Sequence, residues 1–131
     1  MNNDFLHNEK IFQDAVKLRD QGKFNEALAV LERLFLKDPR NLAILLVMAD
    51  LNWDLGRLDK AADFFKLAID SSYNSEPASL GLFHCLWKMG QKVEALDEMK
   101  RFMSISYSKD YAEILNEINE KRGMREEGHS S

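Results

Sequence analysis

The sequence of 131 residues has little cysteine, little proline and no long apolar run. Its one cysteine, Cys85, excludes an intramolecular disulfide. The longest apolar run, Leu42 to Ala49, is far shorter than the roughly 20 residues that a membrane-spanning helix needs. The N-terminus lacks the basic start and apolar run of a secretory signal. We therefore expect a cytoplasmic protein that does not enter a membrane.

An excess of charge of one sign is also lacking. The formal net charge is −4, and acidic and basic residues are mixed along the chain. No stripe of lysine and arginine is present to bind phosphates, so we expect no nucleic-acid partner. Hydrophobic residues make up 45% of the sequence and charged residues 31%, which is typical of one soluble globular domain.

The motifs of catalysis and metal binding are absent as well. The sequence contains no glycine-rich phosphate loop, no His-Glu-x-x-His and no Cys-x-x-Cys. His7, His84 and His129 are far apart, and on a helix the adjacent His84 and Cys85 would point about 100° apart. We therefore expect no enzyme activity, no metal and no cofactor, and we interpret Cys85 as a small buried apolar residue.

An internal repeat of 34 residues is what the sequence does have. Four series of residues keep this interval in one phase: Gly22, Gly56 and Gly90; Ala27, Ala61 and Ala95; Trp53 and Trp87; and Phe12, Leu46 and Leu80. Each period holds two stretches of helical spacing on either side of its glycine. The pattern predicts three helical hairpins, with the glycines ending the first helix of each hairpin.

Helix caps can be predicted from the same pattern. Asn25 and Asp59 are candidate N-caps for the second helices of the first two hairpins, because their side chains can accept from free backbone amides. Ser75 is a candidate cap for the third hairpin, with Pro77 in the first turn.

These motifs resemble the tetratricopeptide-repeat family, over about residues 8–108. The stretches that carry the resemblance are Gly22-Lys23-Phe24-Asn25-Glu26-Ala27-Leu28 with Asp38-Pro39, and Gly56-Arg57-Leu58-Asp59-Lys60-Ala61 with Phe65 and Ala68. The third repeat departs from the family pattern at Phe83, where a small residue is usual, and at Phe102, which replaces an alanine. There is a further, looser similarity to type III secretion chaperones of the same family.

The resemblance implies an all-α fold, a right-handed superhelix of three helical hairpins. The predicted single domain covers residues 4–122, with repeats at about 8–41, 42–75 and 76–108 and a capping helix at 109–122. Tyr111, Ile114, Leu115 and Ile118 would form the apolar face of that helix. Residues 123–131 are interpreted as a flexible tail.

The resemblance also implies a binding face, because first helices line the concave side of such superhelices. The family's groove positions correspond here to Phe12, Val16, Arg19, Leu46, Asp50, Trp53, Leu80, His84, Trp87 and Lys88. Their spacing of three and four residues places them on one face of each first helix. Five of them are interpreted as additional to the core: Phe12, Leu46, Trp53, Leu80 and Trp87. This predicts an apolar groove for an extended segment or an amphipathic helix.

One binding mode of the family is excluded by these residues. A clamp for a C-terminal carboxylate needs Lys, Asn and Arg at fixed groove positions. Those positions are occupied here by Phe12, Val16, Val47, Pro77 and Gly81.

The sequence thus favours a protein–protein interaction module that binds a peptide or helix of a partner protein, as an adaptor or chaperone-like protein. Two alternatives remain open: an immunity or regulatory protein that inhibits a toxin or enzyme, and a self-assembling structural unit such as a homodimer. The groove residues could also pack against the chain's own ends.

Overall fold

The protein is described by a computed structural model that covers the backbone of residues 2–130 and the side chains of residues 4–123. The described residues form seven helices and no strand, which confirms the predicted all-α repeat fold. The helices are α1 (Asn2–Asp20), α2 (Phe24–Lys37), α3 (Leu42–Asp54), α4 (Leu58–Ser71), α5 (Glu76–Lys88), α6 (Lys92–Met103) and α7 (Lys109–Ser130).

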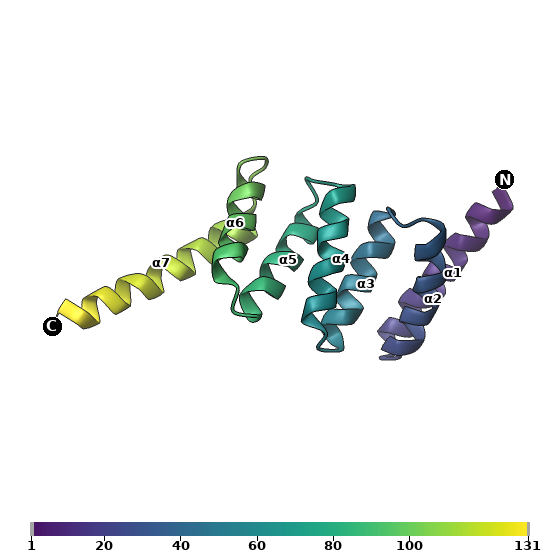
Figure 1. Ribbon diagram of the computed structural model, residues 1–131, viewed down its shortest axis with the longest axis horizontal. Helices are drawn as coiled ribbons and strands as arrows, with labels where there is room; N and C mark the ends of the chain where they lie inside the picture. Colours follow the sequence, from purple (N-terminus) through teal and green to yellow (C-terminus); the bar gives the residue numbers. More distant parts are fainter. Residues whose placement is uncertain (1, 131) are drawn as a thin grey trace.

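The first six helices form three hairpins that stack side by side along the long axis of the molecule (Figure 1). α1, α3 and α5 form one layer, in which α3 contacts both α1 and α5. We call this the inner layer. α2, α4 and α6 form the outer layer, nearer the viewer in Figure 1. Consecutive hairpins meet where α2 contacts α3 and where α4 contacts α5.

The three periodic glycines make the turn inside each hairpin. Gly22, Gly56 and Gly90 have φ angles of 78°, 76° and 83°, in the left-handed region that favours glycine. In the second hairpin, Gly56 N donates to Trp53 O at 2.9 Å and Arg57 N donates to Asn52 O at 2.8 Å. These bonds satisfy the last carbonyls of α3, and the same pattern recurs at the other two turns.

The predicted helix caps are correct in one case of three. Ser75 precedes α5, and its side chain accepts from Ala78 N at 3.3 Å. The predicted caps Asn25 and Asp59 are wrong, because α2 and α4 begin earlier and place both residues inside the first turn. Their N-cap positions, Lys23 and Arg57, directly follow the glycine and have no side-chain cap.

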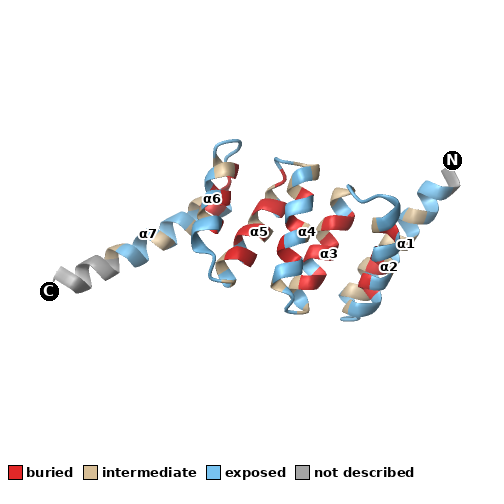
Figure 2. Cartoon of the chain, viewed as in Figure 1, coloured by how far each residue is buried: buried red, intermediate tan, exposed pale blue. Residues whose placement is uncertain are grey.

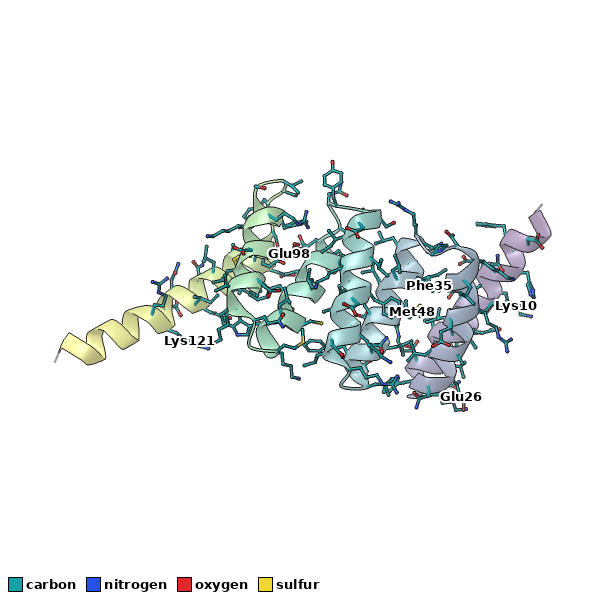
Figure 3. The ribbon with its side chains drawn as sticks, viewed as in Figure 1. Lys10, Glu26, Phe35, Met48, Glu98 and Lys121 are labelled. Atoms are coloured by element: carbon teal, nitrogen blue, oxygen red, sulfur yellow. The ribbon has the colours of Figure 1, made fainter. Side chains whose placement is uncertain are left out.

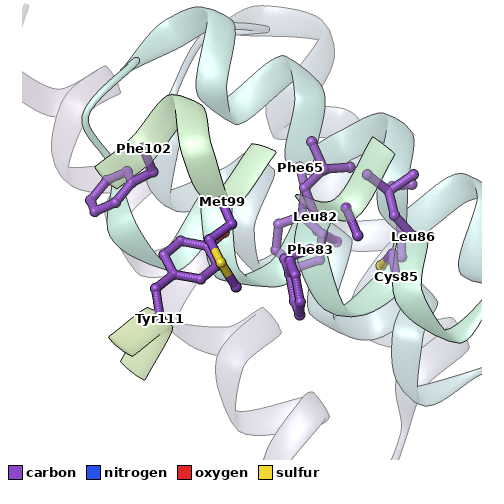
Figure 4. Packing of buried hydrophobic residues seen from close by; sticks show 12 residues of the cluster. Phe65, Leu82, Phe83, Cys85, Leu86, Met99, Phe102 and Tyr111 are labelled. Atoms are coloured by element: carbon purple, nitrogen blue, oxygen red, sulfur yellow. The ribbon is translucent and has the colours of Figure 1, made fainter. Parts of the chain in front are cut away.

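The core follows the faces along which the hairpins meet, and these are the buried stretches in Figure 2. Leu45, Ala68 and Ala78 are fully buried between the second and third hairpins. Beyond the third hairpin the core becomes aromatic. Tyr111 of α7 is fully buried, and its ring centroid lies 5.5 Å from that of Phe83 and 5.9 Å from that of Phe102 (Figure 4).

The two unusual aromatic residues of the third repeat therefore have a packing role. Figure 4 shows Tyr111 close to Met99 and Phe102 of α6. Ser108 precedes α7, and its side chain accepts from Tyr111 N at 3.1 Å, which fixes the start of the helix.

The last helix is longer than the sequence predicts. α7 continues through Gly123 to Ser130, whereas the predicted end is at residue 122. Gly123 and Gly128 each cost only about 1 kcal/mol in a helix, and the Met-Arg-Glu-Glu of residues 124–127 are good helix formers. Ser131 and the side chains of 124–130 lie outside the described residues. On the predicted apolar face, Leu115 is 39% exposed. No helix within the described part of the chain is long and apolar enough to span a membrane.

Candidate functional site

The ten predicted groove residues all lie on α1, α3 and α5, and we call the surface that they occupy the groove face. Asp50, His84 and Lys88 are exposed, whereas the other seven are half-buried. Arg19 lies near Asp20, with Nη2 3.5 Å from Oδ1. The face therefore presents charged groups to solvent between apolar side chains.

The five apolar residues of the groove face that were predicted to be additional to the core pack against it instead. Leu46, Trp53, Leu80 and Trp87 each pack against the core cluster around Phe65, and Phe12 packs against the cluster of the first hairpins. Trp87 also stacks on Phe83, with centroids 5.6 Å apart and an interplanar angle of 18°. The indole ring of a tryptophan such as Trp87 is large enough that one edge contacts the core while the other edge stays at the surface.

A cavity of about 190 Å³ opens between α3 and α5 on the groove face. Its lining brings together three predicted site residues, Asp50, Trp53 and His84. Phe65 of α4 and Gly81 of α5 complete it. The cavity thus combines two aromatic side chains with one carboxylate and one imidazole, and we call it the α3–α5 cavity.

Sequence reasoning missed Phe65 as part of this site, and it placed Gly81 only among the groove positions that cannot form a carboxylate clamp. A Cβ added at Gly81 would overlap the ring of Phe65, so this glycine lets the ring press against the backbone of α5. Glycine within a helix costs about 1 kcal/mol relative to alanine, so its presence at the centre of α5 is a signal of close approach. The partner that approaches could not be identified from the sequence.

Asp50 has an unusual environment for a surface carboxylate. Burial by its surroundings raises the pKa of Asp50 above its ordinary value, and the nearby charge of Asp54 raises it further, while Arg19 lowers it. Within the described part of the chain, neither a hydrogen bond nor a salt bridge reaches this carboxylate. Asp50 therefore loses hydration without gaining a bonded partner.

Each tryptophan of the groove face is covered by a lysine. Lys88 Nζ lies 5.0 Å from the ring centroid of Trp53, and Lys92 Nζ lies 5.1 Å from that of Trp87. Both distances are within the range of a cation–π interaction. The ring faces at this surface thus already accept cations from the chain itself.

A second cavity, of about 240 Å³, lies where α1 and the end of α2 meet the start of α3. Among its lining residues are Phe12 of the predicted site and Phe5, which is 70% exposed. The other lining residues are Asn8, Glu9, Leu34, Lys37, Asp38, Asn41, Ala43 and Ile44. Val16, Arg19, Leu46, Leu80, Trp87 and Lys88 line neither of these two cavities.

The outer layer has its own concavity between α2 and α4, of about 330 Å³. Its charged lining residues include Glu32, Arg57, Lys60 and Asp63. Because two of these residues are acidic and two are basic, the outer concavity has no preference for an anion or a cation.

A buried polar network joins α5, α6 and α7 away from the groove face. Glu98, labelled in Figure 3, accepts from Ser79 Oγ at 2.6 Å and from two nitrogens of Arg101 at 2.8 and 2.7 Å. The Tyr111 hydroxyl lies 2.7 Å from Ser79 Oγ. Burial is the main cause that raises the pKa of Tyr111. These groups satisfy one another and have a structural role.

Cys85 is fully buried, as predicted. Burial and the charge of Asp50 raise its pKa to about 11, so it stays a neutral thiol at pH 7. Among the residues that the structure describes, no group of three or more His, Cys, Asp or Glu side chains could hold a metal ion.

Comparisons with known proteins agree with this architecture. Residues 14–77 match the family model described as tetratricopeptide repeat. No curated protein sequence matches the chain. A similar solved structure is the first tetratricopeptide-repeat domain of Spaghetti (RPAP3) bound to the HSP90 peptide SRMEEVD, with a TM-score of 0.76 and 17% identity, covering 88% of this chain and 93% of that one.

Two further similar structures are a bacterial secretion chaperone and the MamA protein. The Yersinia enterocolitica type III secretion chaperone SycD, in complex with a peptide of the translocator YopD, has a TM-score of 0.73 and 17% identity over 86% of each chain. The MamA protein has a TM-score of 0.69 and 23% identity over 76% of this chain and 55% of that one. Residues 14–77 thus match the tetratricopeptide-repeat family in sequence, and the stacked helical hairpins share the fold of these tetratricopeptide-repeat structures.

Proposed function

We propose that this protein is an adaptor or chaperone-like module that holds a segment of a partner protein on its groove face. The observation that carries the proposal is the α3–α5 cavity, which brings Asp50, Trp53 and His84 together beside half-buried aromatic rings. A concave site with an apolar base and a few polar groups is typical of ligand recognition. Half-buried tryptophans are also frequent anchors in protein interfaces.

The similar structures support binding of a peptide as the mode. The Spaghetti domain and SycD were each solved with a peptide of another protein. This chain would bind a different kind of segment from the HSP90 peptide, because half-buried Phe12 and buried Val47 are among the residues at the clamp positions. Neither side chain can donate to a carboxylate.

A photo-crosslinking experiment tests the location of the site. A benzoylphenylalanine at His84 would probe the groove face, and the same group at Asp63 would probe the outer layer, since both residues are exposed and line a cavity. In lysate of the source cells, we expect a partner to be crosslinked from position 84 and not from position 63. Mass spectrometry would identify it.

Unchanged far-UV circular dichroism would first establish that both variants fold. A partner crosslinked only from position 63 would place the interaction on the outer layer and contradict the proposal. A crosslinked species consisting of two copies of the chain would instead favour the self-assembling unit.

A further inference from the structure

The α3–α5 cavity has the size of one side chain. Its volume is about 190 Å³, and a dry cavity of about 150 Å³ accommodates a benzene-sized group. Phe65 and the backbone at Gly81 close it on one side, while Asp50 and His84 are exposed. One long side chain of a bound segment could enter it, whereas the main chain of the segment would stay outside.

The cations near this cavity already have partners within the chain, whereas the Asp50 carboxylate does not. Arg19 lies 3.5 Å from Asp20, and Lys88 covers the ring of Trp53. Asp50 has no hydrogen-bonded or salt-bridged partner among the described residues, although the charge of Arg19 lowers its pKa and that of Asp54 raises it. A cation at this point would therefore meet a partly dehydrated carboxylate that no side chain of the described residues contacts through a hydrogen bond or a salt bridge. Hydrogen bonds between ionised groups are about twice as strong as neutral ones.

The aromatic wall also suits a cation. Lys88 Nζ lies 5.0 Å from the Trp53 centroid, which shows that this ring can hold a positive charge. Lys88 is exposed and its long side chain is free to choose another rotamer. It occupies the ring in the unbound protein and would compete with a cation from outside.

We propose that the α3–α5 cavity selects a basic side chain, lysine or arginine, from the segment that binds the groove face. The Asp50 carboxylate pairs with the cation, Trp53 and Phe65 contact its apolar stem, and Lys88 moves away from Trp53. This inference rests on the proposed function, because it names the chemistry by which that same surface recognises its partner.

Selection from a library of short random peptides displayed on phage tests the proposal. The wild-type protein is the target, and the best selected peptide is synthesised for affinity measurements. We expect one position of the selected peptides to be enriched in lysine or arginine. Replacing that residue by norleucine, or Asp50 by Asn, should weaken binding about 10- to 100-fold.

Three further variants sharpen the test. Asp63→Asn removes the same charge from the outer layer and should leave the affinity unchanged, because Asp63 lines the other concavity. Lys88→Gln removes the competing cation and should strengthen binding of the basic peptide. Asp50→Lys should reverse the selection and enrich acidic residues at the same position.

The outcomes separate this inference from the proposed function. Peptides that bind the groove face without a basic residue, or that bind Asp50→Asn as well as the wild type, would overturn the basic-side-chain inference and leave the groove intact. Failure to select any peptide that contacts the groove face would overturn both.

Discussion

The junction between the second and third hairpins differs from the junction between the third hairpin and α7. The first is built from small and aliphatic residues: Leu45, Ala68 and Ala78 are all fully buried. At the second, the residues one period after Leu45 and Ala68 are Ser79 and Phe102. Ala49 is likewise replaced by Phe83.

The difference follows from what each hairpin packs against. A neighbouring hairpin presents two helices, and small residues allow them to approach closely. After the third hairpin only α7 follows, and the large rings of Phe83 and Phe102 reach its Tyr111. Its hydroxyl then needs a polar partner, which Ser79 supplies. At the same repeat position, a small residue thus allows a further hairpin to pack, whereas a large aromatic residue contacts the terminal helix α7.

The strongest test of the terminal junction is Tyr111→Ala. Loss of a fully buried aromatic side chain should lower the free energy of unfolding by about 3–5 kcal/mol, measured by urea denaturation. Tyr107→Ala is the control, because Tyr107 is 74% exposed. Equal effects of the two substitutions would show that α7 does not depend on the aromatic cluster.

Close packing of the two helices within the second hairpin is tested by Ala61→Leu. Ala61 is fully buried in α4, and the added methyl groups have no space, so we expect a loss of about 1–3 kcal/mol in a thermal melt. Ala29→Leu is a matched control at an exposed position of α2. An unchanged melting midpoint for Ala61→Leu would contradict close packing of the hairpin.

Glu98→Gln tests the polar part of the terminal junction. The amide keeps the shape of the side chain but loses the charge that receives two hydrogen bonds from Arg101. We expect a loss of about 1–2 kcal/mol in urea denaturation. Glu94, exposed on the same helix, provides the control Glu94→Gln. If both substitutions were neutral, the network would contribute nothing measurable to docking of α7.

The smallest effect is expected at Asp50, between the second and third hairpins. Because the folded-state pKa of Asp50 is raised, mainly by burial, the fold loses stability as pH rises through that pKa. Asp50→Asn should thus be slightly more stable than wild type at pH 7, by no more than about 0.5 kcal/mol. The gain should disappear below about pH 4, where aspartate is protonated in the unfolded chain too. A gain that persists in acid would exclude ionisation as its cause.

The sequence predicted the hairpins well because their turns are local. The interval between Gly22, Gly56 and Gly90 reports a backbone conformation that few other residues adopt, so it locates each turn without any tertiary information. The wrong caps at Asn25 and Asp59 show the limit of this. Only three residues separate the two helices of a hairpin, and the third, Lys23 or Arg57, is the N-cap position. The second helix therefore begins before Asn25 or Asp59 is reached.

The candidate site was less predictable because it depends on contacts between helices. Helical spacing placed Asp50, Trp53 and His84 on one surface, and the structure brings them to one cavity. The depth of that cavity depends on Phe65 of α4 meeting the backbone at Gly81 of α5. Periodicity within one helix carries no information on such a pair. It also could not show how far Leu46 and Leu80 reach into the core.

The placement of Trp53 and Trp87, which are the two tryptophans of the chain, has an optical consequence. Each indole is half-buried with a lysine ammonium within about 5 Å of its centre. Indole emission responds to nearby charge and to water, so removal of Lys88 from Trp53 would change the fluorescence of the unlabelled protein. Occupation of the α3–α5 cavity could therefore be followed in real time without a dye, with Trp87→Phe isolating the signal of Trp53.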